Sequence, residues 1–409
     1  MRAFSTLLFV LFALSANAAD GTVGTVSVQK GNNVSVNGEA PLSLTLDGKD
    51  HQSCQFLSKR APDENHEFTW KEVTTTRGGE LAEILGAQLR SVDSLVVKGY
   101  VNDKDFHAMW DASLYGYLSV INLKNAVLEN NAVPDTAFFH ENEQYEGSSH
   151  EIFYYIGLRK IILPEGLEKI GEGAFYQASA LRQVNFPSTL RYIGDFAFNA
   201  TKLEMNQLVI PEGVEEINQY AFAFCRKLKA QVTLPSTIKK IGEWAFYGSP
   251  ITSINLPEGL ESLGSLSFWD CDLREVSIPS SCHEFNEGWQ FGFNRNLEKM
   301  HLPEGMTEIP DHFAVDCFRL REVNFPHTLK HIGEKAFSLC ISLKNVELPL
   351  GMQSLGEEAF SELEALEQIV FPASMKSLGK NSCSYWKNIK RIYCAAMEPP
   401  VCDPTDGGV

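Results

Sequence analysis

The chain has 409 residues, with 52 Asp and Glu against 35 Lys and Arg, which gives a formal net charge of −17 at pH 7. This acidity argues against a nucleic-acid binder and against a binder of anionic membranes, because both partners are themselves negatively charged. Hydrophobic residues make up 44% of the chain, which suffices for a continuous core. Beyond the first 18 residues, no run reaches the ~20 apolar residues that a membrane helix needs.

Residues 1–18 predict a signal peptide. Arg2 supplies a minimal basic start, residues 7–14 form an apolar run, and Ala16-Asn17-Ala18 offers a small-residue cleavage site. The alternative is an N-terminal helix of the mature protein. With a signal peptide the protein is exported, and we expect it to be secreted or at the cell surface, the periplasmic side included.

Residues 19–76 do not repeat and predict an N-terminal leader or a small β element. Residues 25–28 and 43–46 have the composition of strands, and Gly- and Asn-rich turns separate them.

Residues 77–157 predict atypical N-terminal capping repeats with an insertion. Leu81, Leu85 and Leu89 fall on one face of a helix, and strands are expected at residues 95–99 and 118–123. Terminal repeats are atypical because one of their faces meets water. The insertion, residues 139–156, mixes Glu with Phe and Tyr, which favours either a second binding contact or a plain solvated loop.

Residues 158–388 consist of ten copies of one repeat. A proline recurs every 22 to 24 residues, and a fixed period in this range indicates a solenoid. The repeat is L-x-x-I-x-[LIF]-P-x-x-[LVIM]-x-x-I-G-x-x-A-F-x-x-[CA]. The segment before proline alternates, as at Val323 and Phe325, so it predicts a short strand that proline ends. Gly333 is expected to permit a bend, and Phe337 to enter the core.

Stacking buries an apolar face that one repeat cannot bury alone. Ten strands about 4.8 Å apart predict a parallel ladder on the order of 45 Å long. The bulkier side of each repeat should curve the stack. The predicted fold is therefore an α/β repeat, a leucine-rich-repeat solenoid with a parallel β ladder on the concave face and irregular or short helical turns on the convex face.

Repeats of this form resemble the BspA-like leucine-rich repeats of surface and secreted proteins, over roughly residues 81–394. The resemblance implies a secreted or surface-displayed binding protein, with adhesion to host proteins the best-known role in the family.

Positions three and five of each repeat point away from the predicted core. They are polar, mostly uncharged and poor in aromatic residues, which suits hydrogen bonding to sugars or to a polar protein surface, or simply a solvated sheet. The candidate ligand-binding residues are Asn185, Thr233, Asn255, Ser277, His301, Asn324, Glu347 and Tyr393.

Position two forms a basic row at the strand edge, and acidic rows follow proline and glycine. The rows either pair between neighbouring repeats, each exposed pair contributing little, or present a strip for an acidic partner such as a sulfated glycan. The basic row is Arg159, Arg182, Lys229, Arg274, Arg321 and Lys344, and the acidic residues after proline are Glu165, Glu212, Glu258 and Glu304.

The chain has nine cysteines. Those inside the repeats are expected to pack as small hydrophobic residues, although adjacent repeats bring Cys317 and Cys340 near bridging range. Cys394 and Cys402 lie outside the repeat pattern, in the C-terminal strand and cap predicted for residues 389–409. They are the best candidates for a disulfide in an exported chain.

The chain lacks H-E-x-x-H, paired C-x-x-C and G-x-S-x-G motifs. We therefore expect no enzyme, no cofactor and no metal site. The sequence predicts a protein that binds an extracellular protein through the concave sheet face. The alternatives are glycan binding through the basic row and a self-associating surface or matrix component.

Overall fold

The computed structural model describes residues 66–139 and 156–402, and elsewhere only short strands: β1 (Gly24–Gln29), β2 (Asn33–Gly38), β3 (Leu44–Thr45), β4 (Gln55–Leu57) and β9 (Ile152–Tyr154). The predicted signal peptide, Cys54 and most of the insertion lie outside the described residues. The chain divides into two compact bodies. Body 1 comprises Met1–Asn130, Thr136–Pro164 and Gln177–Val184, and body 2 comprises Asn131–Asp135, Glu165–Tyr176 and Asn185–Val409.

The N-terminal strands partly follow the prediction. β1 and β3 coincide with the two expected strands and pair in parallel, whereas β2, which pairs antiparallel with β1, was not predicted. β4 pairs with β9 in a separate two-stranded sheet.

Body 1 contains the expected strand-and-helix repeats. Its five-stranded parallel sheet has the order β12-β10-β7-β6-β5. The buried Asp105 carboxylate holds two helices together, because it accepts hydrogen bonds from the N–H of Leu81 (2.9 Å) and of Asn102 (3.0 Å). The elements are β5 (Trp70–Thr75), α2 (Leu81–Leu85), η2 (Gly86–Ser91), β6 (Ser94–Val101), α3 (Asp103–Tyr115), β7 (Val120–Leu128), η3 (Glu129–Asn131), β10 (Lys160–Ile162) and β12 (Gln183–Val184).

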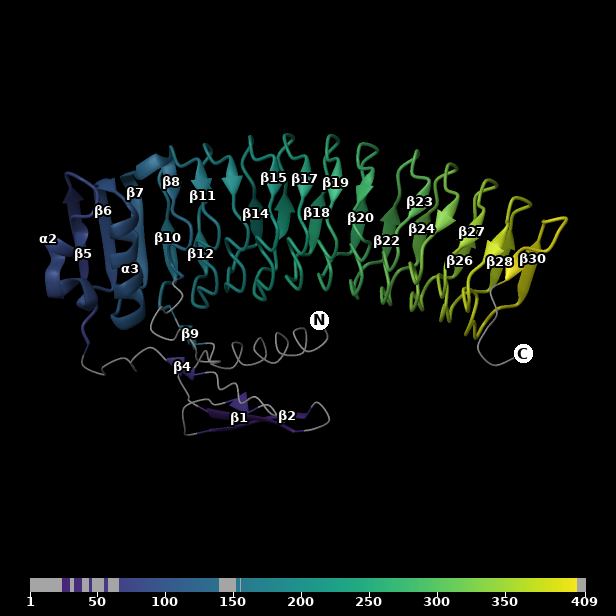
Figure 1. Ribbon diagram of the computed structural model, residues 1–409, viewed down its shortest axis with the longest axis horizontal. Helices are drawn as coiled ribbons and strands as arrows, with labels where there is room; N and C mark the ends of the chain where they lie inside the picture. Colours follow the sequence, from purple (N-terminus) through teal and green to yellow (C-terminus); the bar gives the residue numbers. More distant parts are fainter. Residues whose placement is uncertain are drawn as a thin grey trace. The chain divides into compact units, whose positions relative to one another are not determined.

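In body 2 the strands that precede proline form the expected parallel ladder, here called the first ladder (Figure 1). It consists of three sheets of three strands, and each strand pairs with the next at the same position of the repeat. The strands are β14 (Gln207–Val209), β16 (Gln231–Thr233), β18 (Ser253–Asn255), β20 (Glu275–Ser277), β22 (Lys299–His301), β24 (Glu322–Asn324), β26 (Asn345–Glu347), β28 (Gln368–Phe371) and β30 (Arg391–Cys394).

A second parallel ladder, which the sequence did not predict, runs beside the first. The apolar residue before glycine is the end of a two-residue strand that pairs with its neighbours. The strands are β8 (Ala132–Val133), β11 (Lys169–Ile170), β13 (Tyr192–Ile193), β15 (Glu216–Ile217), β17 (Lys240–Ile241), β19 (Ser262–Leu263), β21 (Glu284–Phe285), β23 (Glu308–Ile309), β25 (His331–Ile332), β27 (Ser354–Leu355), β29 (Ser377–Leu378) and β31 (Val401–Cys402).

The side of each repeat that follows the second ladder is an irregular turn, as predicted. Most of these turns hold two residues in the left-handed region, for example Lys335 (φ 52°) and Leu339 (φ 61°). This backbone lets the turn bond to the next repeat: the N–H groups of Lys335, Phe337 and Leu339 donate to carbonyls of the following turn at 2.8–3.1 Å. The turns therefore form hydrogen bonds between repeats as the strands do.

The glycine after the second strand is required for a different reason from the one expected. Gly333 and Gly356 are not in the left-handed region, so no bend depends on them. A Cβ at Gly356 would lie 2.5 Å from the N atom of Glu334 in the preceding repeat. Glycine is thus needed for close approach of two backbones.

Phenylalanine rings form a continuous stack inside body 2. Adjacent centroids lie 5.2–5.6 Å apart with interplanar angles of 7–11°, and every ring is fully buried. Such burial dominates core energetics, and each aromatic pair adds about 0.5–1.5 kcal/mol. The rings are Phe175, Phe198, Phe222, Phe246, Phe268 and Phe291.

Successive repeats alternate between two turn types after proline. In Pro-Glu-Gly turns the glycine is left-handed, as at Gly166 (φ 96°), and in the next repeat a Ser or Thr replaces it. The Gly166 N–H donates to Thr189 Oγ1 (2.9 Å), whose hydroxyl donates to the Leu167 carbonyl (2.7 Å). The same bonds join Gly213 to Thr237, Gly259 to Ser281 and Gly305 to Thr328.

The acidic row after proline belongs to this alternation. Glu165 accepts from the N–H (3.1 Å) and the hydroxyl (2.9 Å) of Ser188, one repeat later. Glu212, Glu258 and Glu304 accept from Ser236, Ser280 and His327 in the same way. Within the described residues none of these four carboxylates pairs with the basic row, so the predicted pairing of the two rows is wrong for them.

Candidate functional site

The outward side chains of the first ladder in body 2 form a surface that we call the ladder face. Inward residues such as Val232 and Ile254 are buried, whereas Thr233 and Asn255 beside them are exposed. The structure thus places Asn185, Thr233, Asn255, Ser277, Asn324, Glu347 and Tyr393 in exposed positions and His301 in a partly exposed one. Ligand binding by these residues stays a prediction.

The ladder face over β14, β16 and β18 is neutral. Its outward residues are Gln207, Gln231 and Ser253 at position three, and Val209, Thr233 and Asn255 at position five. Among the residues that the structure describes, these polar side chains form no hydrogen bonds with other side chains.

Over β20, β22 and β24 the ladder face is charged but internally paired. Lys299 Nζ lies 3.1 Å from Glu322, which raises the lysine pKa, and His301 Nε2 lies 3.2 Å from Glu275. The Asn324 amide bonds both the N–H (2.9 Å) and the carbonyl (3.1 Å) of Leu302. His301 and Asn324, both predicted to contact a ligand, therefore already have partners within the protein.

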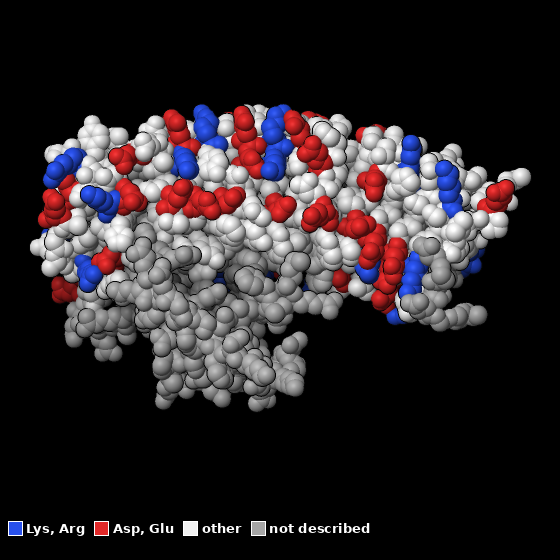
Figure 2. Space-filling view, in the orientation of Figure 1, with Lys and Arg blue, Asp and Glu red and all other residues white. Residues whose placement is uncertain are grey.

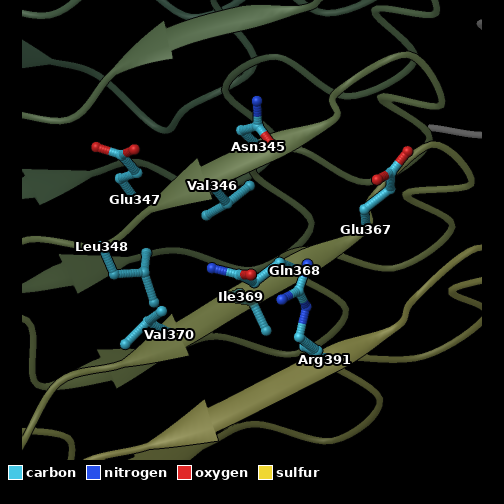
Figure 3. Close-up of a pocket in the computed structure, with 9 residues that line it drawn as sticks. All are labelled: Asn345, Val346, Glu347, Leu348, Glu367, Gln368, Ile369, Val370 and Arg391. Atoms are coloured by element: carbon cyan, nitrogen blue, oxygen red, sulfur yellow. The ribbon is translucent and has the colours of Figure 1, made fainter.

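Over β26, β28 and β30 the ladder face is hollowed into a shallow depression of about 390 Å³ (Figure 3). Asn345 and Gln368 each offer donors and acceptors, Glu347 offers acceptors, and the Arg391 guanidinium offers up to five donors. Within the described part of the chain, none of these four side chains has a hydrogen-bond or ion-pair partner. The depression is lined by Asn345, Val346, Glu347, Leu348, Glu367, Gln368, Ile369, Val370 and Arg391.

The rim of this depression carries a paired charge cluster. Glu367 lies 3.1 Å from Lys344 and 3.1 Å from Lys390, and these two partners lower its pKa. Glu367 stands at position two, between Lys344 of the predicted basic row and Lys390. The cluster leaves Lys344 partly neutralised, and it places an acidic side chain within the predicted basic row.

The remainder of the basic row is exposed. Arg159 and Arg182 lie in body 1, and Lys229, Arg274 and Arg321 in body 2. The Glu298 N–H donates to the Arg274 carbonyl, and the Arg321 N–H donates to the Glu298 carbonyl. Glu298 therefore lies between these two arginines, and an acidic residue again interrupts the basic row. On the face shown in Figure 2, Lys and Arg likewise stand among Asp and Glu.

The repeats match a known family. A model described as the BspA type leucine rich repeat region, in six copies, covers residues 148–231, 230–333 and 308–397. This match spans more than half of the chain. The chain belongs to this family.

One solved structure agrees with the fold of this BspA-type repeat protein, and a second is similar over part of its length. A leucine-rich repeat protein from Bacteroides ovatus is 19% identical, with a TM-score of 0.52, and the match covers 90% of this chain and 92% of that one. A leucine rich cell surface protein from Faecalibacterium prausnitzii is 21% identical, with a TM-score of 0.36, over 64% and 83% of the two chains. At these identities the likeness concerns the fold alone. A search of curated proteins finds no match.

Five of the six cysteines in the BspA-type repeats are buried, as predicted, and four of these five also form hydrogen bonds. Cys340 Sγ donates to the Ala314 carbonyl (3.3 Å) of the preceding repeat, and Cys225, Cys271 and Cys317 make equivalent bonds. Ser249 takes the same place with its hydroxyl (2.6 Å to the Phe222 carbonyl). The row is therefore a series of buried donors, which the sequence interpretation as small hydrophobic residues missed.

The candidate disulfide between Cys394 and Cys402 is not formed. Both thiols are free and exposed. Cys394 ends β30, in register with Phe371 of the first ladder, whereas Cys402 ends β31, in register with Leu378 of the second ladder. The two residues thus belong to different sheets. Cys317 and Cys340 are free as well.

Other kinds of site have no counterpart in the described ranges, 66–139 and 156–402. No group of His, Cys, Asp and Glu there could hold a metal ion, and no helix there has the length and apolarity of a membrane span.

Proposed function

We propose that the protein is exported, resides at the cell surface or outside the cell, and binds an extracellular protein through the ladder face. The proposed contact is the depression over β26, β28 and β30. The role is recognition rather than catalysis, and it accords with membership of a family of bacterial leucine-rich repeat proteins.

One observation carries this proposal. Over β20, β22 and β24, Lys299 pairs with Glu322 and Glu275 pairs with His301. The same positions over β26, β28 and β30 leave an anion, a cation and two amides without partners in the described chain, around a half-exposed Val370 (41%). Since a partner could pair with these groups without breaking internal bonds, this segment suits recognition best.

The test is binding of residues 19–409 to an array of extracellular-matrix proteins and glycans at low and moderate salt. Three variants introduce arginine at position five of three different segments: Asn255→Arg, Ser277→Arg and Val370→Arg. We expect a saturable protein ligand whose affinity falls at least tenfold in Val370→Arg and less than twofold in the other two. Equal losses in all three variants would instead spread the contact over the whole ladder face.

Glycan binding through the basic row remains the second candidate because Arg274 and Arg321 form no ion pair among the described residues. It predicts a sulfated-glycan signal that disappears with salt, survives Val370→Arg and is lost in Arg274→Glu/Arg321→Glu.

Self-association is the third candidate. Ile392 of β30 occupies an inward position of the ladder, yet it is 57% exposed. A second copy that covered this edge would give light scattering that grows with protein concentration and is suppressed by Ile392→Lys.

A further inference from the structure

Body 2 has a second surface that the sequence did not reveal, on the turns that follow the second ladder. Eight aromatic side chains gather there, and each is partly exposed, in contrast to the buried phenylalanine stack. We call this set the aromatic strip: Phe196, Tyr220, Trp244, Tyr247, Trp269, Trp289, Phe293 and His312.

The aromatic strip consists of two clusters. In the first, Phe196, Tyr220 and Trp244 stack face to face at 4.7 and 5.2 Å, and Tyr247 packs 4.4 Å from Trp244. In the second, Trp289 stacks on His312 at 3.6 Å, and Trp269 lies 5.2 Å from Trp289 and 4.5 Å from Phe293.

The fold does not require these rings. Phe196, Tyr220, Trp244, Trp289 and His312 occupy equivalent left-handed positions of their turns, with φ between 55° and 67°. Gly173, Lys335, Glu358 and Asn381 occupy the same position in other repeats, with φ between 52° and 57°. Left-handed backbone disfavours bulky side chains and favours Gly and Asn. Aromatic residues here therefore run against the preference of the backbone.

The charges around the aromatic strip are mainly negative. The carboxylate of Glu243 interacts electrostatically with Tyr220, and that of Asp270 with Tyr247. The carboxylates of Asp311, Glu334 and Glu358 interact in the same way with His312. Against these five carboxylates stand Arg226 and Lys335, while Arg295 lies over the Phe293 ring and Lys240 lies near Glu243. Burial together with Glu243 raises the pKa of Tyr220 to about 12. A cation is thus the complementary partner for this surface.

The protein's own arginines already bind to aromatic rings bordering or within the strip. Arg226 Cζ lies 5.4 Å from the Phe224 ring centroid while its guanidinium pairs with Asp270 at 3.1 Å. Arg295 Cζ lies 5.9 Å from the rings of both Phe293 and Phe318. A planar guanidinium can satisfy a ring and a carboxylate together, which the compact ammonium of lysine does less well.

We propose that the aromatic strip docks an arginine-containing segment of a partner polypeptide. Its guanidinium groups stack on exposed ring faces and pair with the neighbouring carboxylates. From Phe196 to His312 the strip spans five repeat intervals, about 24 Å at ~4.8 Å per interval. An extended segment of roughly seven residues covers this length at ~3.3 Å per residue.

The test uses the full chain and two fluorescein-labelled peptides, octa-arginine and octa-lysine, followed by fluorescence anisotropy at 50 and 150 mM salt. The variant Trp244→Asn/Trp289→Asn places at two strip positions the residue found at Asn381. Its matched control, Gly173→Asn/Asn381→Gly, changes the same turn position outside the strip and leaves the net charge unchanged. Near-UV circular dichroism and melting verify that both variants fold.

We expect octa-arginine to bind at least fivefold more tightly than octa-lysine, and the strip variant to lose at least tenfold in octa-arginine affinity. The control variant and Val370→Arg should change it less than twofold. Equal affinity for the two peptides, or no effect of the strip variant, would overturn the proposal in favour of diffuse attraction to an acidic protein. A lack of binding at 50 mM salt would also overturn it. The proposal would also be overturned if the wild type self-associated, or bound a neutral oligosaccharide, and the strip variant abolished that binding.

Discussion

The interior of body 2 and its ladder face follow opposite rules, although both are built from the same repeats. Inside, most repeats make the same contacts as the last: a stacked phenylalanine, a glycine against the preceding backbone, and a buried donor to a carbonyl. Outside, each three-stranded sheet differs, from neutral to internally paired to unpaired. The repeated interior contacts make the core continuous from repeat to repeat. The outward side chains change from sheet to sheet, and this variation creates distinct surfaces for recognition.

Breaking the interior should have the largest effect. Phe222→Ala removes a fully buried ring that stacks on two others at 5.3 and 5.4 Å. We expect the free energy of unfolding to fall by about 3–5 kcal/mol, measured by urea denaturation. The outward control Val370→Arg should change it by less than about 0.5 kcal/mol. Similar losses in both variants would contradict the division between the two regions.

A pair of glycines five residues apart tests the backbone contact. Gly356→Ala places a Cβ 2.5 Å from the Glu334 N atom, whereas Gly351→Ala meets its nearest atom at 3.8 Å, and neither residue has positive φ. We expect Gly356→Ala to cost about 1–3 kcal/mol. Gly351→Ala should be neutral or stabilise by up to about 1 kcal/mol, because it restricts the unfolded chain. Equal unfolding midpoints would show that the repeats can move apart without cost.

The cysteine row offers a milder change. Cys340→Val removes the donor to the Ala314 carbonyl and should destabilise by about 1–3 kcal/mol, because a buried acceptor is left unsatisfied. Cys340→Ser keeps a donor, as Ser249 does in its repeat, and should lose less. The order of the two variants, read from melting temperatures, decides whether the thiol acts as a donor or only as apolar volume.

Thiol reactivity sharpens the same contrast between inside and outside. Burial raises the pKa of Cys225 to about 11 and of Cys317 to about 12, whereas Cys394 and Cys402 are exposed. Since the thiolate is the reactive form, a native-state thiol reagent should label the two exposed cysteines first. The core cysteines should react only on unfolding, and mass spectrometry of labelled peptides identifies each one.

The smallest effect concerns body 1. The Thr76 N–H, which donates to Glu80 at 2.7 Å, and further bonds from Arg77 lower the pKa of Glu80 from 4.5 to about 2. The ionised carboxylate therefore stabilises the fold above pH 4.5, and this contribution is lost as the pH falls towards 2. Glu80→Gln should lose less stability than the wild type between pH 4.5 and 2. If the urea midpoints of Glu80→Gln and the wild type fell by the same amount between pH 4.5 and 2, the lowered pKa of Glu80 would be contradicted.

The strands of the first ladder and their outward register were predictable because three alternating residues before a proline suffice to assign each side chain to a face. The second ladder was not, because a two-residue strand such as Glu216–Ile217 shows no alternation. The role of Gly333 was misjudged since close approach of a neighbouring backbone leaves no trace in local sequence. The repeat period shows which residues occupy the same position in successive repeats. It does not show that Glu165 accepts hydrogen bonds from Ser188 in the next repeat.

The contents of the ladder face were only half predictable. That Glu347 and Asn324 point outward follows from their position in the repeat. That Asn324 is bonded to Leu302 while Glu347 has no partner among the described residues depends on side-chain geometry. The aromatic strip could not be predicted from strand alternation because it lies in irregular turns, although Phe196, Tyr220 and Trp244 occupy the same position of successive repeats.

The alternation of Pro-Glu-Gly turns with Ser- or Thr-containing turns sets the size of the module that evolution or an engineer can add or remove. A glycine donor and its glutamate neighbour find their hydroxyl partners only in the next repeat. Excising one repeat would set two turns of the same type side by side and orphan these groups. Excising two neighbouring repeats would rejoin unlike turns. Two neighbouring repeats, one with each turn type, therefore form the unit by which this solenoid can be lengthened or shortened.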